Sequence, residues 1–414
     1  MNNKKFWTRY NDYVEKRVLE LIEAKERDGE GFALCDFHIH SNHSSDGKQS
    51  VEDIINESIK YGFEIISITD HDCVSAYDEL YKLLKKGLLP EKAPIIIPGI
   101  EHTVSFREYR TMCHIVKYFI NPKSKDVNHD IKKLNVSYYN RAKIQLDRIL
   151  KSEFYQSIFQ TYKIRVGYKD FLRYLKQRHE IPDYAPLVDY LAIKFHDAGL
   201  KTAELYRLVR EFNDKDPCVE RRQMKLERFA YLDNKYQNID VQDNRRFMLS
   251  ILGVRGVDDA YFPEYPISGS LSVDEYGQVS IYDLNHDGVT VFAHPEHDRV
   301  HLIENVKECA GGFWGLELNF KSKQEFFGEL IAEAKKQNLH ITCGSDRHAK
   351  TEPVYENLDF YRINIYDLKS FIDEKHKKGW VLYGEGVADC CCVYNIINQI
   401  KIAVICWYKF ENHY

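Results

Sequence analysis

Short runs of apolar, often β-branched residues recur near both ends of the chain, and segments with a helical spacing of apolar positions separate them. Near the start the runs occupy residues 32–38, 64–70, 93–101 and 112–120, and the pattern resumes at 289–294, 315–320 and 340–346. Apolar runs that alternate with helices are typical of parallel strands joined by helical crossovers. The pattern therefore predicts an α/β barrel encoded in two separate parts of the sequence.

The first predicted helix has its own start and stop signals. Ser50 and Asp53 match a capping box before residues 51–61, and Gly62 stands where helices often end in a residue with positive φ. A second helix is expected around residues 329–337, between two of the later apolar runs.

The middle of the chain follows a different pattern. From about Asn121 to about Asp287, helical spacing with Tyr, Phe, Lys and Arg replaces the β-branched runs, which indicates a mainly helical insertion. We expect an N-terminal helix, a first barrel part, the insertion, a second barrel part and an apolar C-terminal segment, at residues 1–31, 32–120, 121–287, 288–389 and 390–414.

Composition and charge place the chain among ordinary soluble proteins. Its 414 residues are 44% hydrophobic, and the net charge of -5 does not point to a polyanionic partner. The N-terminal segment has charges throughout and lacks the apolar run of a secretory signal. The C-terminal segment falls short of the roughly 20 continuous apolar residues of a spanning helix. We expect a cytoplasmic protein without a membrane anchor.

Most of the ten cysteines stand singly in apolar runs, as expected of reduced, buried thiols. Cys390, Cys391 and Cys392 are adjacent and could bind metal or be redox-active, but adjacent ligands without a nearby second pair make poor zinc geometry. The C-terminal segment is interpreted as a final strand or an interface segment. It or the insertion could contact a second copy of the chain or a partner subunit.

Candidate chemistry begins in the first predicted strand, within DFHIHSNHSSDG at residues 36–47. Residues two apart in a strand share a face, so His38 and His40 point the same way and could hold one ion. An isolated pair of this kind is more often structural. Metal-ligand residues, however, also follow or lie within five further strand-like runs: Asp70, His71 and Asp72; Glu101 and His102; His114; His294; and Asp346 and His348.

The carboxyl ends of parallel barrel strands open on one face, so these residues are expected to be neighbours. If each were structural, buried ionisable groups would be left unpaired at six places, each at a cost of several kcal/mol. A shared cluster of cations would satisfy all of them together.

The motifs resemble those of the polymerase and histidinol phosphatase (PHP) family of metal-dependent phosphoesterases. The resemblance rests on His38-x-His40 with Ser45-Asp46-Gly47, Thr69-Asp70-His71-Asp72, Gly99-Ile100-Glu101, His114, Ala293-His294-Pro295 and Gly344-Ser345-Asp346-x-His348. It implies a distorted (β/α)7 TIM-like barrel that holds two to three divalent metal ions. Position by position, it assigns the first ion to His38, His40, Glu101 and Asp346, the second to Glu101, His114 and His294, and the third to Asp46, His71 and His348.

Imidazole and carboxylate ligands together suit Zn, Mn or Fe. Family members with this Ser-Asp-Gly turn usually have one residue fewer before the aspartate, so His43 or the additional serine remains an alternative to Asp46.

Such a cluster implies hydrolysis without a Ser or Cys nucleophile. Two ions bridged by Glu101 could lower the pKa of a bridging water, so that hydroxide attacks phosphorus. Arg299 and Arg347 could clamp phosphoryl oxygens or be solvated rim residues, and His297 could donate a proton to the leaving group or be a surface histidine. Asp70 and Asp72 could orient ligand histidines.

The insertion has a local excess of positive charge. Lys132–Arg178 contains twelve basic and three acidic residues, with Tyr and Phe residues between them. Basic residues bind phosphates and aromatic rings stack on bases, which favours single-stranded nucleic acid as the partner. Alternatively, the rings form the core of a helical subdomain and the charges form its solvated surface.

The sequence therefore favours a nuclease or 5'-3' exonuclease. The alternative is a small-molecule phosphatase for a nucleotide or a histidinol-phosphate-like monoester. A third possibility, an inactive scaffold subunit of a larger complex, is disfavoured because nothing structural requires nine converging ligands.

Overall fold

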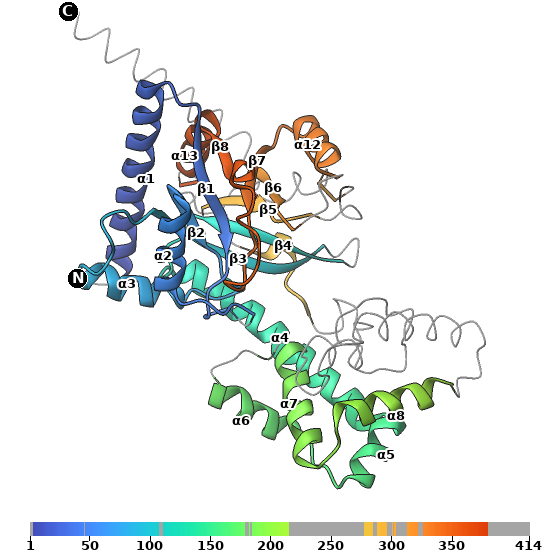
Figure 1. The fold of residues 1–414 in the computed structure, drawn as a ribbon. Helices are drawn as coiled ribbons and strands as arrows, with labels where there is room; N and C mark the ends of the chain where they lie inside the picture. The colour runs from blue at the N-terminus through green and yellow to red at the C-terminus, as the bar shows by residue number, and fades with distance from the viewer. Residues whose placement is uncertain are drawn as a thin grey trace, which may run out of the picture.

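The centre of the molecule is an eight-stranded sheet in the order β7-β6-β5-β4-β3-β2-β1-β8 (Figure 1). The computed structural model describes residues 3–44, 46–106, 111–178, 182, 184–214, 277–284, 288–295, 300, 302–303, 313–321 and 326–379. The strands are β1 (Phe32–Ile39), β2 (Ile65–Ile68), β3 (Ile95–Phe106), β4 (Thr111–Tyr118), β5 (Val289–Phe292), β6 (Gly315–Asn319), β7 (His340–Gly344) and β8 (Arg362–Asn364).

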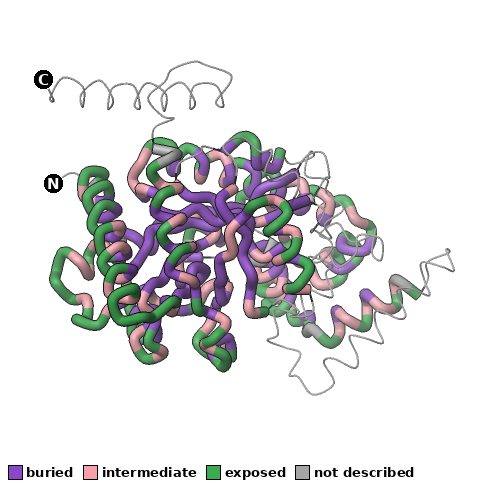
Figure 2. The backbone as a smooth tube through the Cα atoms, turned by 90° about the horizontal axis from the view of Figure 1, so that it is seen from above, coloured by how far each residue is buried: buried purple, intermediate pink, exposed green. Residues whose placement is uncertain are grey.

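The two ends of the strand series meet and turn the sheet into a barrel. Just beyond β7, the amide of Asp346 donates to the His38 carbonyl at 2.8 Å, and the amide of His40 donates to the Arg347 carbonyl at 2.9 Å. β8 pairs antiparallel with the start of β1. The predicted TIM-like barrel encoded in two parts of the chain is confirmed, and Figure 2 shows its strands as the buried centre of the molecule.

One strand departs from the predicted parallel arrangement. β4 runs antiparallel to both β3 and β5. Only residues 107–110 separate β3 from β4, which is far too short for the crossover that a parallel pair needs. Glu101 and His114 consequently lie within long paired strands and not at strand ends.

α1 (Asn3–Asp28) packs across the end of the barrel at which β3 begins and β4 ends (Figure 1). Its Asn11 side chain donates to the carbonyls of Phe119 and Ile120 at 2.9 and 3.0 Å. Its buried apolar residues follow helical spacing, and they are Trp7, Tyr10, Val14, Val18 and Ile22. This helix therefore covers the barrel end opposite to the predicted ligands.

α2 (Val51–Tyr61) begins and ends as predicted. Ser50 and Asp53 form the capping box, and Gly62 has a left-handed φ of 78°. The other helices of the barrel are α3 (Ala76–Lys86), α12 (Phe327–Lys336) and α13 (Ile365–Gly379), with short 3-10 turns at η2 (Ile281–Asp283) and η5 (Leu358–Tyr361).

A long helix leads from the barrel to a second group of helices (Figure 1). These are α4 (Lys125–Lys151), α5 (Glu153–Thr161), α6 (Tyr168–Arg178), α7 (Tyr184–Asp197) and α8 (Thr202–Asp214). The group has a hydrophobic core of its own, which includes Leu146, Tyr155, Phe171 and Leu191. Residues 215–276 and 380–414, with Cys390, Cys391 and Cys392, lie outside the described residues. Among the described helices, none is long and apolar enough to cross a membrane.

Candidate metal centre

Glu101 lies at the centre of the predicted ligands. Its side chain is fully buried in the middle of β3. Oε1 lies 2.9 Å from His114 Nδ1 and 3.0 Å from His294 Nε2. Oε2 lies 3.1 Å from His38 Nε2, 3.2 Å from His40 Nε2 and 3.0 Å from His71 Nδ1. One carboxylate thus contacts five histidines that come from four separate segments of the chain.

The nine predicted ligands fall into three overlapping groups. Within each group, the potential ligand atoms lie within 4.8 Å of one another: His38, Glu101, His294 and Asp346; His71, Glu101 and His114; and His40, Asp46, His71 and His348. This grouping differs from the family-based assignment because it places His294 with the first group and His40 with the third. His40 also borders the first group, since its Nε2 lies 3.1 Å from Asp346 Oδ1.

Asp46 and its alternative His43 point in different directions. Asp46 Oδ2 lies 3.1 Å from His348 Nε2 and 3.4 Å from His71 Nε2. His43 instead turns away and contacts Glu79 at 3.0 Å. Ser45, the additional serine of the turn, lies outside the described residues. Of the two that the structure describes, Asp46 is therefore the one that faces the cluster.

The arrangement of the donor atoms fits a bound cation. His38 Nε2 and His40 Nε2 lie 3.0 Å apart, and His114 Nδ1 and His294 Nε2 lie 3.3 Å apart. Two imidazole lone pairs at such a distance repel unless a proton or a cation lies between them. Nitrogen ligands at about 2.0–2.1 Å from a shared ion would be separated by about 3 Å. His71 Nδ1 and Glu101 Oε2 lie 3.0 Å apart, yet among the described residues neither buried atom has a partner in hydrogen-bond geometry.

The cluster polarises its own members. Burial alone raises the pKa of Glu101, but His38, His71 and His114 outweigh it and hold that pKa well below the ordinary value. Burial likewise opposes protonation of His38, yet Glu101 and Glu317 raise its pKa well above the usual range. Glu101 is therefore an ionised carboxylate surrounded by imidazoles.

Two ligands have a backbone conformation that non-glycine residues rarely adopt. His294 has a φ of 25° and Asp346 a φ of 48°. Such conformations cost on the order of 1–3 kcal/mol and persist where the surrounding structure imposes them, often at functional sites. Here each places a ligand side chain just after a barrel strand.

Glu317 is a buried carboxylate that the sequence reasoning missed. Its two oxygens lie 2.8 and 3.1 Å from His38 Nδ1, and both side chains are fully buried. Because the carboxylate accepts a hydrogen bond from Nδ1–H, the proton stays on Nδ1 and the His38 Nε2 lone pair is directed at the cluster. A single Glu between Leu316 and Leu318 in an apolar strand was the signal that could have revealed it.

The predicted orienting roles of Asp70 and Asp72 are not those in the structure. Asp70 accepts from the amide and the hydroxyl of Ser41 at 2.6 and 2.7 Å. Asp72 contacts His102 Nδ1 at 2.9 Å and accepts a hydrogen bond from the Tyr138 hydroxyl of α4. Asp72 thereby connects the loop that carries His71 to the first helix beyond the barrel.

Arg347 does not face the cluster. Its guanidinium is 3% exposed and donates to Glu57 at 3.0 Å and to the carbonyls of Ala349 and Lys350 at 3.0 and 2.6 Å. A phosphate clamp at this position would have to break a buried ion pair, so the geometry does not support the predicted clamp role of Arg347. Arg299 and His297 lie outside the described residues.

Lys321, which was not predicted, lies at the rim of the cluster instead. Its Nζ is 3.3 Å from His348 Nδ1 and 2.8 Å from Glu352 Oε2, and it donates to the Asp346 carbonyl. The side chain is 36% exposed. The segment after β6 thus places a cation in contact with two predicted ligands, Asp346 and His348.

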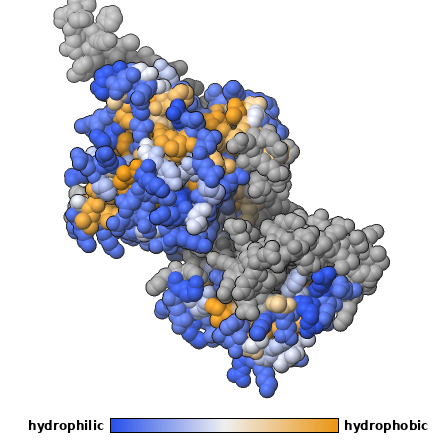
Figure 3. Space-filling view, in the orientation of Figure 1, coloured by the Kyte–Doolittle hydropathy of each residue, from blue (hydrophilic) through white to orange (hydrophobic). Residues whose placement is uncertain are grey.

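The aromatic residues of Lys132–Arg178 are mainly core residues. Phe154, Tyr155 and Phe171 are buried, and Tyr139 is 42% exposed. The basic residues mostly face solvent, which gives α4–α6 the hydrophilic surface seen in Figure 3; the exposed ones are Lys132, Lys143, Lys151, Lys163, Arg165, Lys169, Arg173, Lys176 and Arg178. For the buried rings, the structure thus supports the alternative interpretation, in which they form the core of a helical subdomain. These rings are unavailable for base stacking.

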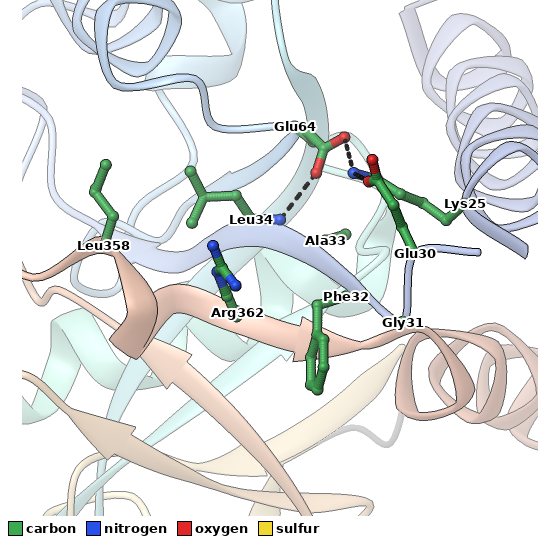
Figure 4. A pocket seen from close by; sticks show the side chains of 9 residues that line it. All are labelled: Lys25, Glu30, Gly31, Phe32, Ala33, Leu34, Glu64, Leu358 and Arg362. Carbon is green, nitrogen blue, oxygen red and sulfur yellow. Dashed lines mark hydrogen bonds and ion pairs between the residues drawn. The ribbon is translucent and has the colours of Figure 1, made fainter. Parts of the chain in front are cut away.

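A hollow of about 440 Å³ lies beside the first residues of β1, Phe32 to Leu34. Lys25, Glu64 and Arg362 line it together with apolar residues, and Glu64 accepts from the Leu34 amide and pairs with Lys25 at 3.0 Å (Figure 4). It contains none of the nine predicted ligands, so the cluster and this hollow are separate features.

Comparison with known proteins identifies the same part of the chain. Residues 36–204 match the family model of the PHP domain. DNA polymerase III PolC-type from three Streptococcus pneumoniae strains is 29% identical in an alignment 99 residues long, which covers 21% of this chain and 7% of the polymerase. The chain therefore matches only a small part of that enzyme.

A search of solved structures found two similar chains, each 17% identical to this one. One is a chain from Bifidobacterium adolescentis assigned as a metal-dependent phosphoesterase, with a TM-score of 0.47 over 82% of this chain and 96% of that chain. The other is an amidohydrolase from Chromobacterium violaceum, with a TM-score of 0.45 over 81% and 100%. The family match at residues 36–204 includes six of the nine clustered ligands, and the chain contains a PHP domain, of the polymerase and histidinol phosphatase family.

Proposed function

We propose that the protein is a divalent-metal phosphoesterase whose site is the cluster around Glu101. The observation that carries the proposal is the contact of one fully buried carboxylate with five histidines, beside Asp46 and Asp346. Mn, Zn or Fe suits this mixture of ligands. When bound, such ions would polarise a phosphoryl group and lower the pKa of a coordinated water.

The chain's own residues would hold and orient this site. Glu101 would bridge the groups of ligands, and Glu317 would fix the orientation of His38. Side-chain exposure rises from 0% at His38 and Glu101 to 28% at His114 and 41% at Asp46. Substrate would therefore approach from the side of the cluster formed by Asp46 and His114.

The described cysteines do not offer a competing nucleophile. Cys35, Cys113 and Cys343 are buried. Cys73 lies next to the ligand loop, but burial and the nearby Asp70 raise the pKa of its thiol to about 12. Because the thiolate is the reactive form, Cys73 would be inert near neutral pH.

For the substrate, we propose single-stranded nucleic acid, hydrolysed as a nuclease or 5'-3' exonuclease. The exposed basic residues of α4–α6 support this, because they could track a phosphate backbone without base stacking. The short similarity to a polymerase is consistent with a nucleic-acid setting. The alternative is a small phosphomonoester, which the burial of most rings in Lys132–Arg178 favours.

The test is hydrolysis of labelled single-stranded RNA and DNA beside a panel of small phosphomonoesters, with added Mn or Zn. His40→Ala should abolish turnover on every substrate. Polymer cleavage that weakens with salt would support the nuclease, and phosphate release from small esters alone would support the monoesterase. No hydrolysis of any substrate by protein that retains its metal would contradict the proposal and favour a scaffold.

The role of the basic helices has a separate test. Lys143→Gln with Lys151→Gln on α4 removes two exposed charges, and Lys85→Gln with Lys86→Gln on α3 is the matched control. If the α4 lysines contact phosphates, the dependence of log K on log salt should fall by about one unit of slope for each lysine removed. Equal slopes for both double variants would exclude α4 from the binding surface.

A further inference from the structure

A line of polar side chains continues from β6 along the metal cluster. Leu316 and Leu318 face outward and pack in the hydrophobic core that includes Leu330 of α12. Residues two apart in a strand share a face, and Glu317, on the other face, contacts His38 inside the barrel. Asn319 is therefore directed to the same side as Glu317, toward the cluster.

The side chain of Asn319 presents a buried donor without a partner. It is 3% exposed, and its Oδ1 accepts from the Lys321 amide at 2.7 Å. Only the oxygen of the carboxamide can accept from an N–H group, so this bond fixes which way the amide points. The amide nitrogen Nδ2 has no hydrogen-bond partner among the described residues. Buried polar groups are rarely left unpaired without a functional reason.

Lys321 places a positive charge beside this amide. Two of the three donors on its ammonium are used by the Asp346 carbonyl and by Glu352 Oε2 at 2.8 Å. Nζ also lies 3.3 Å from His348 Nδ1, which is 2.7 Å from the Asp346 carbonyl. An Nδ1 that donates its proton to this carbonyl cannot also accept from Lys321, so the third ammonium donor is left at the partly exposed rim. A neutral donor fixed in the interior and a charged donor at the rim thus lie on one edge of the site.

We propose that Asn319 Nδ2 and Lys321 Nζ bind the non-bridging oxygens of the substrate's phosphoryl group. This inference rests on the proposed phosphoesterase function and deepens it, because it names substrate-binding residues that are not metal ligands. Phosphoryl oxygens are strong acceptors, and charge-assisted hydrogen bonds to them are stronger than those between neutral groups. The two donors would hold the phosphoryl group common to monoesters and diesters.

The variants are Asn319→Asp and Lys321→Gln. Asn319→Asp keeps the oxygen that accepts from the Lys321 amide and removes the free donor. Asn364→Asp is its matched control, because Asn364 Oδ1 accepts from the Tyr366 amide at 2.8 Å in the same way, after β8. Lys336→Gln on α12 is the control for Lys321→Gln, since its side chain is 61% exposed on the surface.

The measurements are KM for a phosphate ester, inhibition by inorganic phosphate, the shift in thermal unfolding that phosphate causes, and metal content. We expect KM and the phosphate inhibition constant to rise about 10-fold or more in both variants. Metal content should equal that of the wild type, and both controls should be unchanged. Lys321→Gln removes a rim side chain and keeps the test decisive if Asn319→Asp fails to fold.

The inference and the proposed function fail differently. Normal hydrolysis with unchanged KM and phosphate inhibition in both variants would overturn the inference alone, and so would a loss of bound metal, because the residues would then support the ligands. Wild-type protein that binds phosphate but hydrolyses no ester would overturn the proposed function. The inference would still stand if the variants lost phosphate binding. Absence of both hydrolysis and phosphate binding in the wild type would overturn both.

Discussion

Glu317→Gln is the substitution that most directly tests how the protein fixes its ligands. Glu317 accepts with both oxygens near His38 Nδ1, at 2.8 and 3.1 Å, and neither side chain is exposed. Glutamine keeps the shape but replaces one acceptor by an NH2 group, which would face another donor. It also removes one of the two charges, those of Glu101 and Glu317, that raise the pKa of His38.

The size of the effect follows from the role of such carboxylates. Loss of a carboxylate that orients a ligand histidine typically weakens metal binding 10- to 100-fold, which is about 1.4–2.7 kcal/mol. We expect Glu317→Gln to lie in this range, because the contact is fully buried and water cannot replace the lost acceptor.

The assay is equilibrium dialysis against Mn or Zn with a competing chelator, followed by metal analysis and by activity as a function of metal concentration. Glu91→Gln, an exposed position between α3 and β3, is the matched control. Thermal unfolding of the metal-free proteins separates a loss of affinity from a loss of folding. If Glu317→Gln bound metal as tightly as the control, the reasoning about His38 would be refuted.

Three further predictions concern close packing, the α4 contact and a helix pairing. In Gly344→Ala the new Cβ would lie 2.4 Å from the Cβ of His38, so metal affinity and folding stability should both fall. In the control Gly328→Ala the new Cβ meets nothing within 4 Å, and folding stability should be unchanged or increased. Equal metal affinity in the two variants would contradict the prediction. Tyr138→Phe removes the hydroxyl that donates to Asp72 and should lower the free energy of unfolding in urea by about 1–3 kcal/mol. The control Tyr139→Phe, at an exposed position, should leave the free energy of unfolding almost unchanged. Similar losses in the two variants would refute the contact. Glu15→Gln should cost roughly 1 kcal/mol at neutral pH by weakening the pairing of α1 with α13. Burial opposes ionisation of Glu15, but two basic partners on α13 lower its pKa overall, so the difference from wild type should be present above about pH 4.3 and vanish as the pH falls through the lowered pKa; a difference that persisted in acid would show another cause.

The sequence alone determined the elements of the barrel and most of its chemistry. β-branched runs gave the strands, and the signals at Ser50 and Gly62 gave the limits of α2, because these patterns report local preferences. His38 and His40 were recognisable from their spacing in one strand. Ligand residue types next to several strands predicted that Glu101 and its neighbours would converge, because barrel topology brings such positions together.

Only the tertiary structure decided which groups face each other. The direction of β4 turned His114 toward Glu101, and the closure of β7 on β1 brought Glu317 against His38. Arg347 is adjacent to a ligand in sequence, yet its side chain points into a buried ion pair, whereas Lys321, distant in sequence from every predicted ligand, reaches the rim. Sequence spacing fixes the face of a strand on which a side chain lies, but the partner of that side chain depends on which distant segment packs there.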